Sequence, residues 1–178
     1  MYAKFFINIF FLITLIIIQL AFINGLPSWF NKLNLVLIIL IYILSFKDLK
    51  IATFWTIGAG FLLDVYSFLP FGFYVISLFL SILLADFLLI NFFTNRSLYS
   101  FLAITFFSII LYEIILNLLI IIWQFFISKV TFFLFFKEFW LNLSIRLLVN
   151  LIFVFILFYL INFVSLKLKP VFLIKTKP

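Results

Sequence analysis

Long apolar runs fill most of this chain, and short polar or glycine- and proline-containing breaks separate them. A helix that crosses the hydrocarbon core of a bilayer needs about 20 mostly apolar residues. The pattern therefore predicts an all-α integral membrane bundle of about six transmembrane helices, of which the second and third are short for a full crossing. The predicted spans cover residues 5–23, 33–46, 51–66, 71–90, 98–123 and 140–164.

The breaks between the runs carry residues that are typical of turns and membrane interfaces. Residues 24–34 (NGLPSWFNKLN) hold a glycine, a proline and a tryptophan, and residues 47–50 (KDLK) read as a tight charged turn. The partly apolar connection 124–139 is expected to lie either in the interface or in the outer aqueous space. We divide the chain into a six-helix transmembrane domain, residues 1–166, and a basic cytoplasmic tail, residues 167–178.

The composition agrees with a membrane protein and excludes several kinds of chemistry. The chain is 69% hydrophobic and 10% charged, whereas soluble domains are about 25% charged. Cysteine and histidine are both absent from the sequence. Disulfides, thiolate nucleophiles and imidazole metal ligands are therefore excluded. We predict no metal site and no cofactor.

The net charge of +7 is unevenly divided between the two predicted faces of the membrane. Lysine and arginine near span ends favour the cytoplasmic side. With six spans, the face that holds both termini collects most of them, so we predict that both termini are cytoplasmic. Because the basic residues are scattered singly, they do not indicate nucleic-acid binding. That face holds Lys4, Lys47, Lys50, Arg96, Lys167, Lys169, Lys175 and Lys177, and the other holds Lys32, Lys129 and Lys137.

Four ionisable residues fall inside the predicted spans, where charges are costly and are candidates for function. At a rise of about 1.5 Å per residue, Asp64, Glu113 and Arg146 all come to lie in the outer half of the bundle. Asp86 lies nearer the cytoplasmic end. We expect Arg146 to pair with Glu113 or Asp64 in a salt bridge between helices. A proton or ion relay and a contact site for a partner's membrane helix are the alternatives.

Three asparagines extend this group. Asn117 follows Glu113 by four residues, and Asn142 and Asn150 flank Arg146 at the same spacing. Residues four apart share a helix face, so a polar stripe is expected on the last span. Lipid cannot satisfy such a stripe, and it must face protein or water.

Features that break a helix are concentrated between Gly58 and Gly72. With Ile57 in front, this segment reads IGAGFLLDVYSFLPFG. Two glycines allow close helix packing or a kink, an acid lies where the third span ends, and a proline begins the next element. On physical grounds alone it is a hairpin between two membrane helices. Its residues are Gly58, Gly60, Asp64, Ser67, Pro70 and Gly72.

Read as GxGxxxDxxSxxPxG, this hairpin resembles the signature segment of the MreD family, small inner-membrane proteins that bacteria need for rod shape. The chain length, the number of spans and the basic tail also resemble that family, although Phe68 stands where many members carry glycine. The resemblance implies a non-catalytic scaffold in the bacterial cytoplasmic membrane. Its implied partners are MreC, the actin-like MreB, a SEDS-type glycosyltransferase and a class B penicillin-binding protein.

The fold of that family is similar to the substrate-binding S-components of energy-coupling-factor vitamin transporters. This similarity implies an alternative function, the capture of a vitamin in a polar, aromatic-lined pocket at the outer face. The aromatic side chains near that face are those of Trp29, Tyr66, Tyr74 and Trp140, which are equally typical of an interfacial belt. A membrane enzyme is the third possibility, and it lacks the carboxylate pair or histidine that such chemistry uses.

Overall fold

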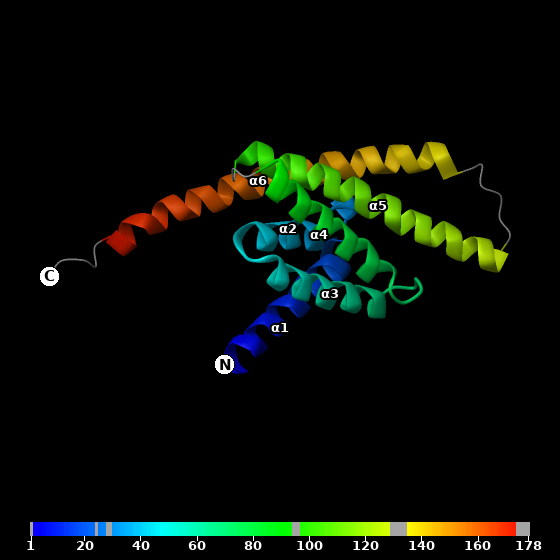
Figure 1. Ribbon diagram of the computed structural model, residues 1–178, viewed down its shortest axis with the longest axis horizontal. Coiled ribbons are helices and arrows are strands. Elements are labelled where there is room, and N and C mark those ends of the chain that lie inside the picture. The colour runs from blue at the N-terminus through cyan, green and yellow to red at the C-terminus, as the bar shows by residue number, and fades with distance from the viewer. Residues whose placement is uncertain (1, 24, 28–29, 94–96, 129–134, 174–178) are drawn as a thin grey trace.

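The computed structural model describes residues 2–23, 25–27, 30–93, 97–128 and 135–173, and this part of the chain is all-helical. Six α-helices follow one another along the chain (Figure 1). A π-helical segment, η1, continues α1, and a 3₁₀ turn, η2, precedes α2. The elements are α1 (Tyr2–Ile17), η1 (Ile18–Ile23), η2 (Phe30–Lys32), α2 (Leu35–Phe46), α3 (Leu49–Tyr66), α4 (Phe73–Asn91), α5 (Leu98–Ser128) and α6 (Phe135–Leu173).

Four of these helices are long and apolar enough to cross a membrane, among the described residues. They are α3, α4 and the apolar parts of α5 and α6, Leu98–Phe126 and Glu138–Leu160. The apolar helices Ile9–Ile23 and Leu35–Phe46 are shorter. The prediction of six helices is therefore confirmed, whereas full membrane crossing is supported by length for four. With 12 residues, α2 reaches only about 18 Å at about 1.5 Å per residue.

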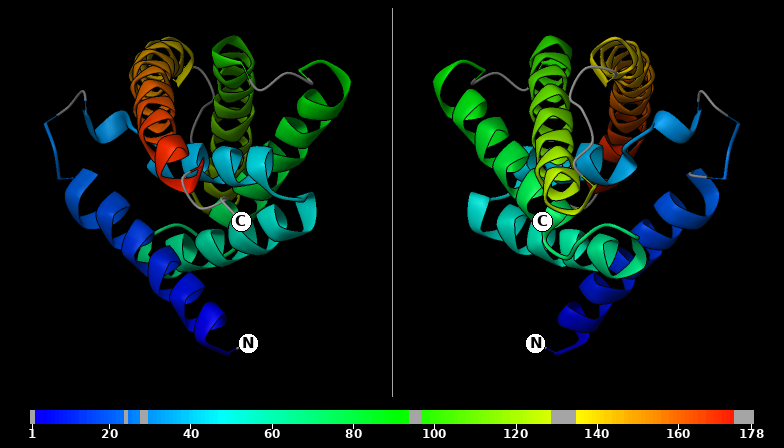
Figure 2. Two further views of the ribbon diagram at one scale, coloured as in Figure 1. Left: turned by 90° about the vertical axis from the view of Figure 1, so that its left-hand side faces the viewer. Right: turned by 90° about the vertical axis from the view of Figure 1, so that its right-hand side faces the viewer.

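The short helix α2 lies at the centre of the bundle. It contacts α3, α4, α5 and α6, and its buried residues fall on every side of the helix. Figure 2 shows α2 and α3 between α1 on one side and α4, α5 and α6 on the other. A helix that is apolar all round is expected in such a buried position. Its buried residues are Val36, Leu37, Ile38, Leu40, Ile41, Tyr42, Leu44 and Ser45.

Both of the last two helices exceed their predicted bounds. Helix α5 continues to Ser128 and α6 begins at Phe135. The prediction that residues 124–139 form a connection is therefore wrong for 124–128 and 135–139, and 129–134 lie outside the described residues. Neither glycine nor proline occurs in this stretch, so nothing in it stops a helix. Helix α6 also includes residues 167–173 of the predicted tail, and its second half projects beyond the other helices (Figure 1).

Candidate functional site

The hairpin between α3 and α4 is held by the carboxylate of Asp64. Its Oδ1 accepts a hydrogen bond from the backbone N–H of Tyr74 at 2.9 Å, and its Oδ2 accepts from Gly72 at 3.0 Å and Val75 at 3.3 Å. The first N–H groups of a helix have no partner within it, and an acceptor there stabilises the helix. Asp64 is buried, with 4% of its surface exposed. It therefore caps α4 from the preceding helix.

Two glycines of the hairpin, Gly60 and Gly72, occupy positions that disfavour a side chain, each for a different steric reason. A Cβ at Gly60 would lie 2.7 Å from the Cα of Val75, so α3 and α4 touch there backbone to backbone. Gly72 has φ +99°, a conformation that side-chain-bearing residues rarely adopt, and serves as the N-cap of α4. At Gly58 the nearest atom to an added Cβ is the side-chain tip of Leu12, at 3.1 Å.

The turn itself is built by the remaining signature residues. The hydroxyl of Ser67 donates to the backbone oxygen of Asp64 at 3.2 Å and accepts from the N–H of Leu69 at 3.3 Å. The carbonyl of Pro70 accepts from the N–H of Phe73 at 3.4 Å. The predicted hairpin is thus confirmed as a helix break.

Glu113 on α5 and Arg146 on α6 form the predicted salt bridge between helices. Nη1 of the arginine lies 2.5 Å from Oε1 of the glutamate. The glutamate side chain is 7% exposed and that of the arginine 37%. A charge inside a membrane bundle is costly unless it is paired, and this ion pair explains how both residues are accommodated. Asp64, the other carboxylate considered as a partner, bonds to the backbone of α4 instead.

Two buried side-chain amides fasten the segment that leads into α2. Asn150 on α6 is fully buried. Its Nδ2 donates to the carbonyls of Lys32 at 3.1 Å and Arg146 at 2.7 Å, and its Oδ1 accepts from the N–H of Asn34 at 2.8 Å. From the other side, Gln19 in η1 donates to the carbonyl of Leu33 and accepts from the N–H of Leu35, both at 2.9 Å. Of the predicted polar stripe on α6, Asn150 therefore faces protein, whereas Asn142 is exposed and Arg146 is partly exposed.

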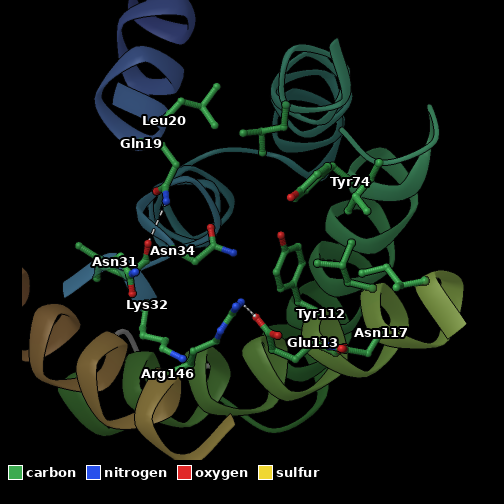
Figure 3. A pocket seen from close by; sticks show the side chains of 15 residues that line it. Gln19, Leu20, Asn31, Lys32, Asn34, Tyr74, Tyr112, Glu113, Asn117 and Arg146 are labelled. Atoms are coloured by element: carbon green, nitrogen blue, oxygen red, sulfur yellow. Dashed lines mark hydrogen bonds and ion pairs between the residues drawn. The ribbon is translucent and has the colours of Figure 1, made fainter. Parts of the chain in front are cut away.

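These elements surround a cavity of about 310 Å³ (Figure 3). It is bounded by η1, by the segment before α2, by the α3–α4 hairpin and by α5 and α6. Figure 3 shows the hydroxyls of Tyr74 and Tyr112 on one side of it and Gln19, Asn31 and Lys32 on the other. The polar lining residues are Gln19, Asn31, Lys32, Asn34, Tyr74, Tyr112, Glu113, Asn117 and Arg146, and the apolar ones are Leu20, Leu33, Leu63, Leu69, Leu116 and Ile120.

The predicted polar residues divide into three groups around this cavity. Glu113, Asn117 and Arg146 line it directly, and Nδ2 of Asn117 donates to the carbonyl of Glu113 at 2.8 Å. Asn142 lies just outside the lining and accepts a hydrogen bond from Nζ of Lys32. Asp86 belongs to α4 and does not line the cavity, in agreement with its predicted separation from the cluster.

Sequence reasoning missed the opposite wall of the cavity. Asn31, Lys32 and Asn34 belong to the predicted first loop, and Gln19 is one of two side-chain amides within the first apolar run. That glutamine was a usable signal, because an amide inside a membrane helix requires a partner. It lies in the π-helical segment η1, and π-helical turns inside helices are frequent at functional sites.

Only one of the four aromatic residues considered for a pocket lines this cavity. Tyr74 does so, whereas Tyr66 and Trp140 are exposed at the molecular surface and are absent from the lining. Trp29 lies outside the described residues. Tyr112, which was not singled out from the sequence, supplies the second aromatic side chain.

The lining of the cavity carries groups that can bind a ligand. Glu113 is the one carboxylate in its lining, and that side chain is engaged by Arg146. Within the described part of the chain, no group of three or more acidic side chains gathers in a way that could hold a metal ion. Cations, amides and phenols are the groups that line it, and these recognise a polar ligand by charge and hydrogen bonding.

Comparison with known proteins identifies no relative of this chain. No protein-family model, no curated protein and no solved structure matches it.

Proposed function

We propose that this protein is a non-catalytic, multi-pass scaffold of the bacterial cytoplasmic membrane, similar to MreD proteins. In this role it binds MreC and helps to position peptidoglycan synthesis along the cell wall, and so maintains cell shape. MreB, the SEDS-type glycosyltransferase and the class B penicillin-binding protein are its further partners in the same assembly. Its helix faces contact the membrane segments of these proteins.

The organisation of the signature hairpin is the observation that carries this proposal. Five of the six residues of the pattern GxGxxxDxxSxxPxG act together in the hairpin: Asp64 caps α4, Gly60 admits its backbone, Gly72 takes the positive φ, and Ser67 and Pro70 form hydrogen bonds in the turn. These linked roles support the proposal, because the residues that carry the resemblance are the ones that build the hairpin.

Recovery of partners from native membranes tests the scaffold role. The tagged chain is solubilised in a mild detergent, and the proteins that accompany it are identified by mass spectrometry. We expect MreC and the elongation synthases in amounts comparable to the tagged chain. An unrelated tagged multi-span protein from the same cells is the control. Absence of MreC from the wild-type sample, with the chain itself intact, argues against the scaffold.

A second candidate function is supported by the cavity. An S-component of a vitamin transporter needs a polar, aromatic-lined pocket between its helices, and the cavity beside Tyr74 and Tyr112 has this character. In this case the same purification recovers a pair of ATPases and a stoichiometric small molecule in place of MreC. The two candidates are therefore separated by one experiment.

A further inference from the structure

The charges around the cavity leave a positive excess. Lys32 and Arg146 line it as cations, and Glu113 is the one anion in the lining. Asp64 is absent from the lining, and both oxygens of its carboxylate accept hydrogen bonds from the start of α4, where the helix N-terminus offsets part of its negative charge. A cavity with two cations and one anion favours an anionic occupant, the more so where little water screens the charges.

Arg146 keeps hydrogen-bond donors beyond those that its salt bridge uses. A guanidinium carries five N–H donors, and Nη1 donates to Oε1 of Glu113. Nε is buried and has no hydrogen-bond partner among the described residues. A buried donor without a partner costs free energy, and a carboxylate or phosphate oxygen is the acceptor that a guanidinium binds best.

Lys32 is held at the edge of the same cavity. Its backbone carbonyl accepts from Asn150, and its ammonium donates to Oδ1 of Asn142. Because an ammonium has three donors, the bond to Asn142 orients the group and leaves capacity for a further acceptor. Two cations thus approach the cavity from separate elements, η2 and α6.

The wall across the cavity has a different character. Tyr74 and Tyr112 lie there, opposite Lys32 (Figure 3), and the apolar lining includes Leu63, Leu69 and Leu116. The volume of about 310 Å³ falls at the lower end of the range of about 300–1,000 Å³ that small-molecule sites occupy. The shape and lining therefore fit a small molecule with one charged end and an apolar or aromatic body.

We propose that this cavity binds a small organic anion, whose carboxylate or phosphate group is held by Arg146 and Lys32 and whose body packs against the tyrosine and leucine wall. Glu113 acts as the positioning residue that fixes the guanidinium. This inference names the ligand class for the second candidate function, and it does not rest on the scaffold role. A phospholipid headgroup carries the same anionic chemistry, and the test separates it from a soluble molecule.

The test measures thermal unfolding of the purified chain by far-ultraviolet circular dichroism in a non-ionic detergent. Benzoate, inorganic phosphate and a short-chain phosphatidylglycerol are titrated separately, with chloride at equal ionic strength as the reference. A ligand that binds only the folded state raises the unfolding midpoint in proportion to its occupancy. Lys32→Gln removes one cation, and Glu113→Gln with Arg146→Gln removes the charged pair while keeping hydrogen-bonding groups. Lys47→Gln, at an exposed position that does not line the cavity, is the matched control.

We expect benzoate to raise the midpoint of the wild type and of Lys47→Gln, and its apparent affinity to fall at least tenfold in Lys32→Gln. If the double variant fails to fold, Lys32→Gln carries the comparison alone. Equal responses to benzoate, phosphate and chloride overturn the proposal, as does stabilisation that Lys32→Gln retains in full. Stabilisation by phosphatidylglycerol alone overturns the proposal of a soluble organic anion and shows that the site binds a lipid headgroup. None of these readings depends on whether MreC is recovered, so the scaffold role succeeds or fails separately.

Discussion

Asp64 on α3 and Tyr74 on α4 are joined by a hydrogen bond of 2.9 Å from the tyrosine N–H to the carboxylate, which makes one helix the cap of the next. The N-cap position of α4 is occupied by Gly72, which has no side chain to cap with. Asp64, eight residues before Gly72, supplies the missing acceptor, and its negative charge also interacts favourably with the helix N-terminus. A carboxylate in the membrane domain is thus explained by local structure.

Replacing Asp64 by alanine should destabilise the protein. Three N–H groups at the start of α4 lose their acceptor, and loss of a buried cap costs about 2 kcal/mol. Asp86→Ala is the control, because that side chain is partly exposed on the same helix, and we expect a change within about 0.5 kcal/mol. Thermal unfolding in detergent measures both. In a rod-shaped host that depends on the protein, Asp64→Ala should also impair shape more than Asp86→Ala. Equal tolerance of both variants there would count against the family resemblance.

The two helical glycines of the hairpin should respond differently to alanine. At Gly60 the new Cβ would meet backbone atoms of Val75 at 2.7 and 3.0 Å, which cannot move without separating the helices. Overpacking of this kind costs about 1–3 kcal/mol. At Gly58 the new methyl would meet only the flexible tip of Leu12, and alanine gains up to about 1 kcal/mol of helix propensity. Gly60→Ala should lower the unfolding midpoint and Gly58→Ala should leave it unchanged or raise it; the reverse order would refute the assigned packing.

The fold could largely be predicted because apolar runs and their breaks are strong signals in membrane proteins. The hairpin at residues 67–72 separates two helices as expected, and so does the turn predicted at 47–50, although α3 already begins at Leu49. The ends of α5 and α6 could not be placed, because residues 124–128 and 135–139 have no helix-stopping residue and their apolar character suits a helix and an interfacial segment equally.

The candidate site could be predicted only on the side that carries intramembrane charge. Spacing placed Glu113 and Arg146 at a similar depth, and they do pair. The opposite wall comes from residues before α2, such as Asn34, whose positions depend on bonds to Asn150, 116 residues away. No local pattern encodes a contact of that range. The reason differs for Asp64, where depth alone suggested an ion pair and the nearby backbone of α4 provided closer partners.

The charge distribution predicts which end of the bundle faces the cytoplasm, and single cysteines can test it. The native chain has no cysteine, so any labelling by a membrane-impermeant thiol reagent reports the introduced residue alone. Pro27 and Asp48 are both exposed and lie at opposite ends of α2. We expect Pro27→Cys to be labelled in intact spheroplasts and Asp48→Cys to be labelled only after the membrane is opened. Labelling of Asp48→Cys from outside would invert the proposed orientation.

The pair Glu113–Arg146 should show strong coupling. Removing one partner by Glu113→Gln or Arg146→Gln leaves the other charge with a neutral neighbour inside the bundle, whereas the double variant has two neutral amides that can bond to each other. Contacting residues of this kind show interaction energies of about 0.5–3 kcal/mol. The double variant should therefore be more stable than the sum of the single effects predicts. A double-mutant cycle on unfolding free energies measures the coupling, and strict additivity would mean that the bridge contributes nothing in the membrane domain.

Asn150 should matter more than Asn142, although both lie on the same face of α6. Asn150 is fully buried and bonds to the backbone of Lys32, Asn34 and Arg146, so alanine leaves several buried groups without partners at a cost of about 2–3 kcal/mol. Asn142 is exposed, and its replacement should cost less than about 0.5 kcal/mol.

The destabilisation caused by Asn150→Ala should also loosen the structure locally. The hydrogen bonds of Asn150 fasten the segment before α2, and this segment forms one wall of the cavity. A cysteine introduced at Asn31, in a chain without any other, reports the exposure of that segment through its rate of modification. We expect Asn150→Ala to increase that rate several-fold and Asn142→Ala to leave it near the wild-type value. If both variants are modified at the wild-type rate while Asn150→Ala still lowers the unfolding midpoint, Asn150 stabilises the bundle as a whole and other contacts, such as those of Gln19, hold the wall.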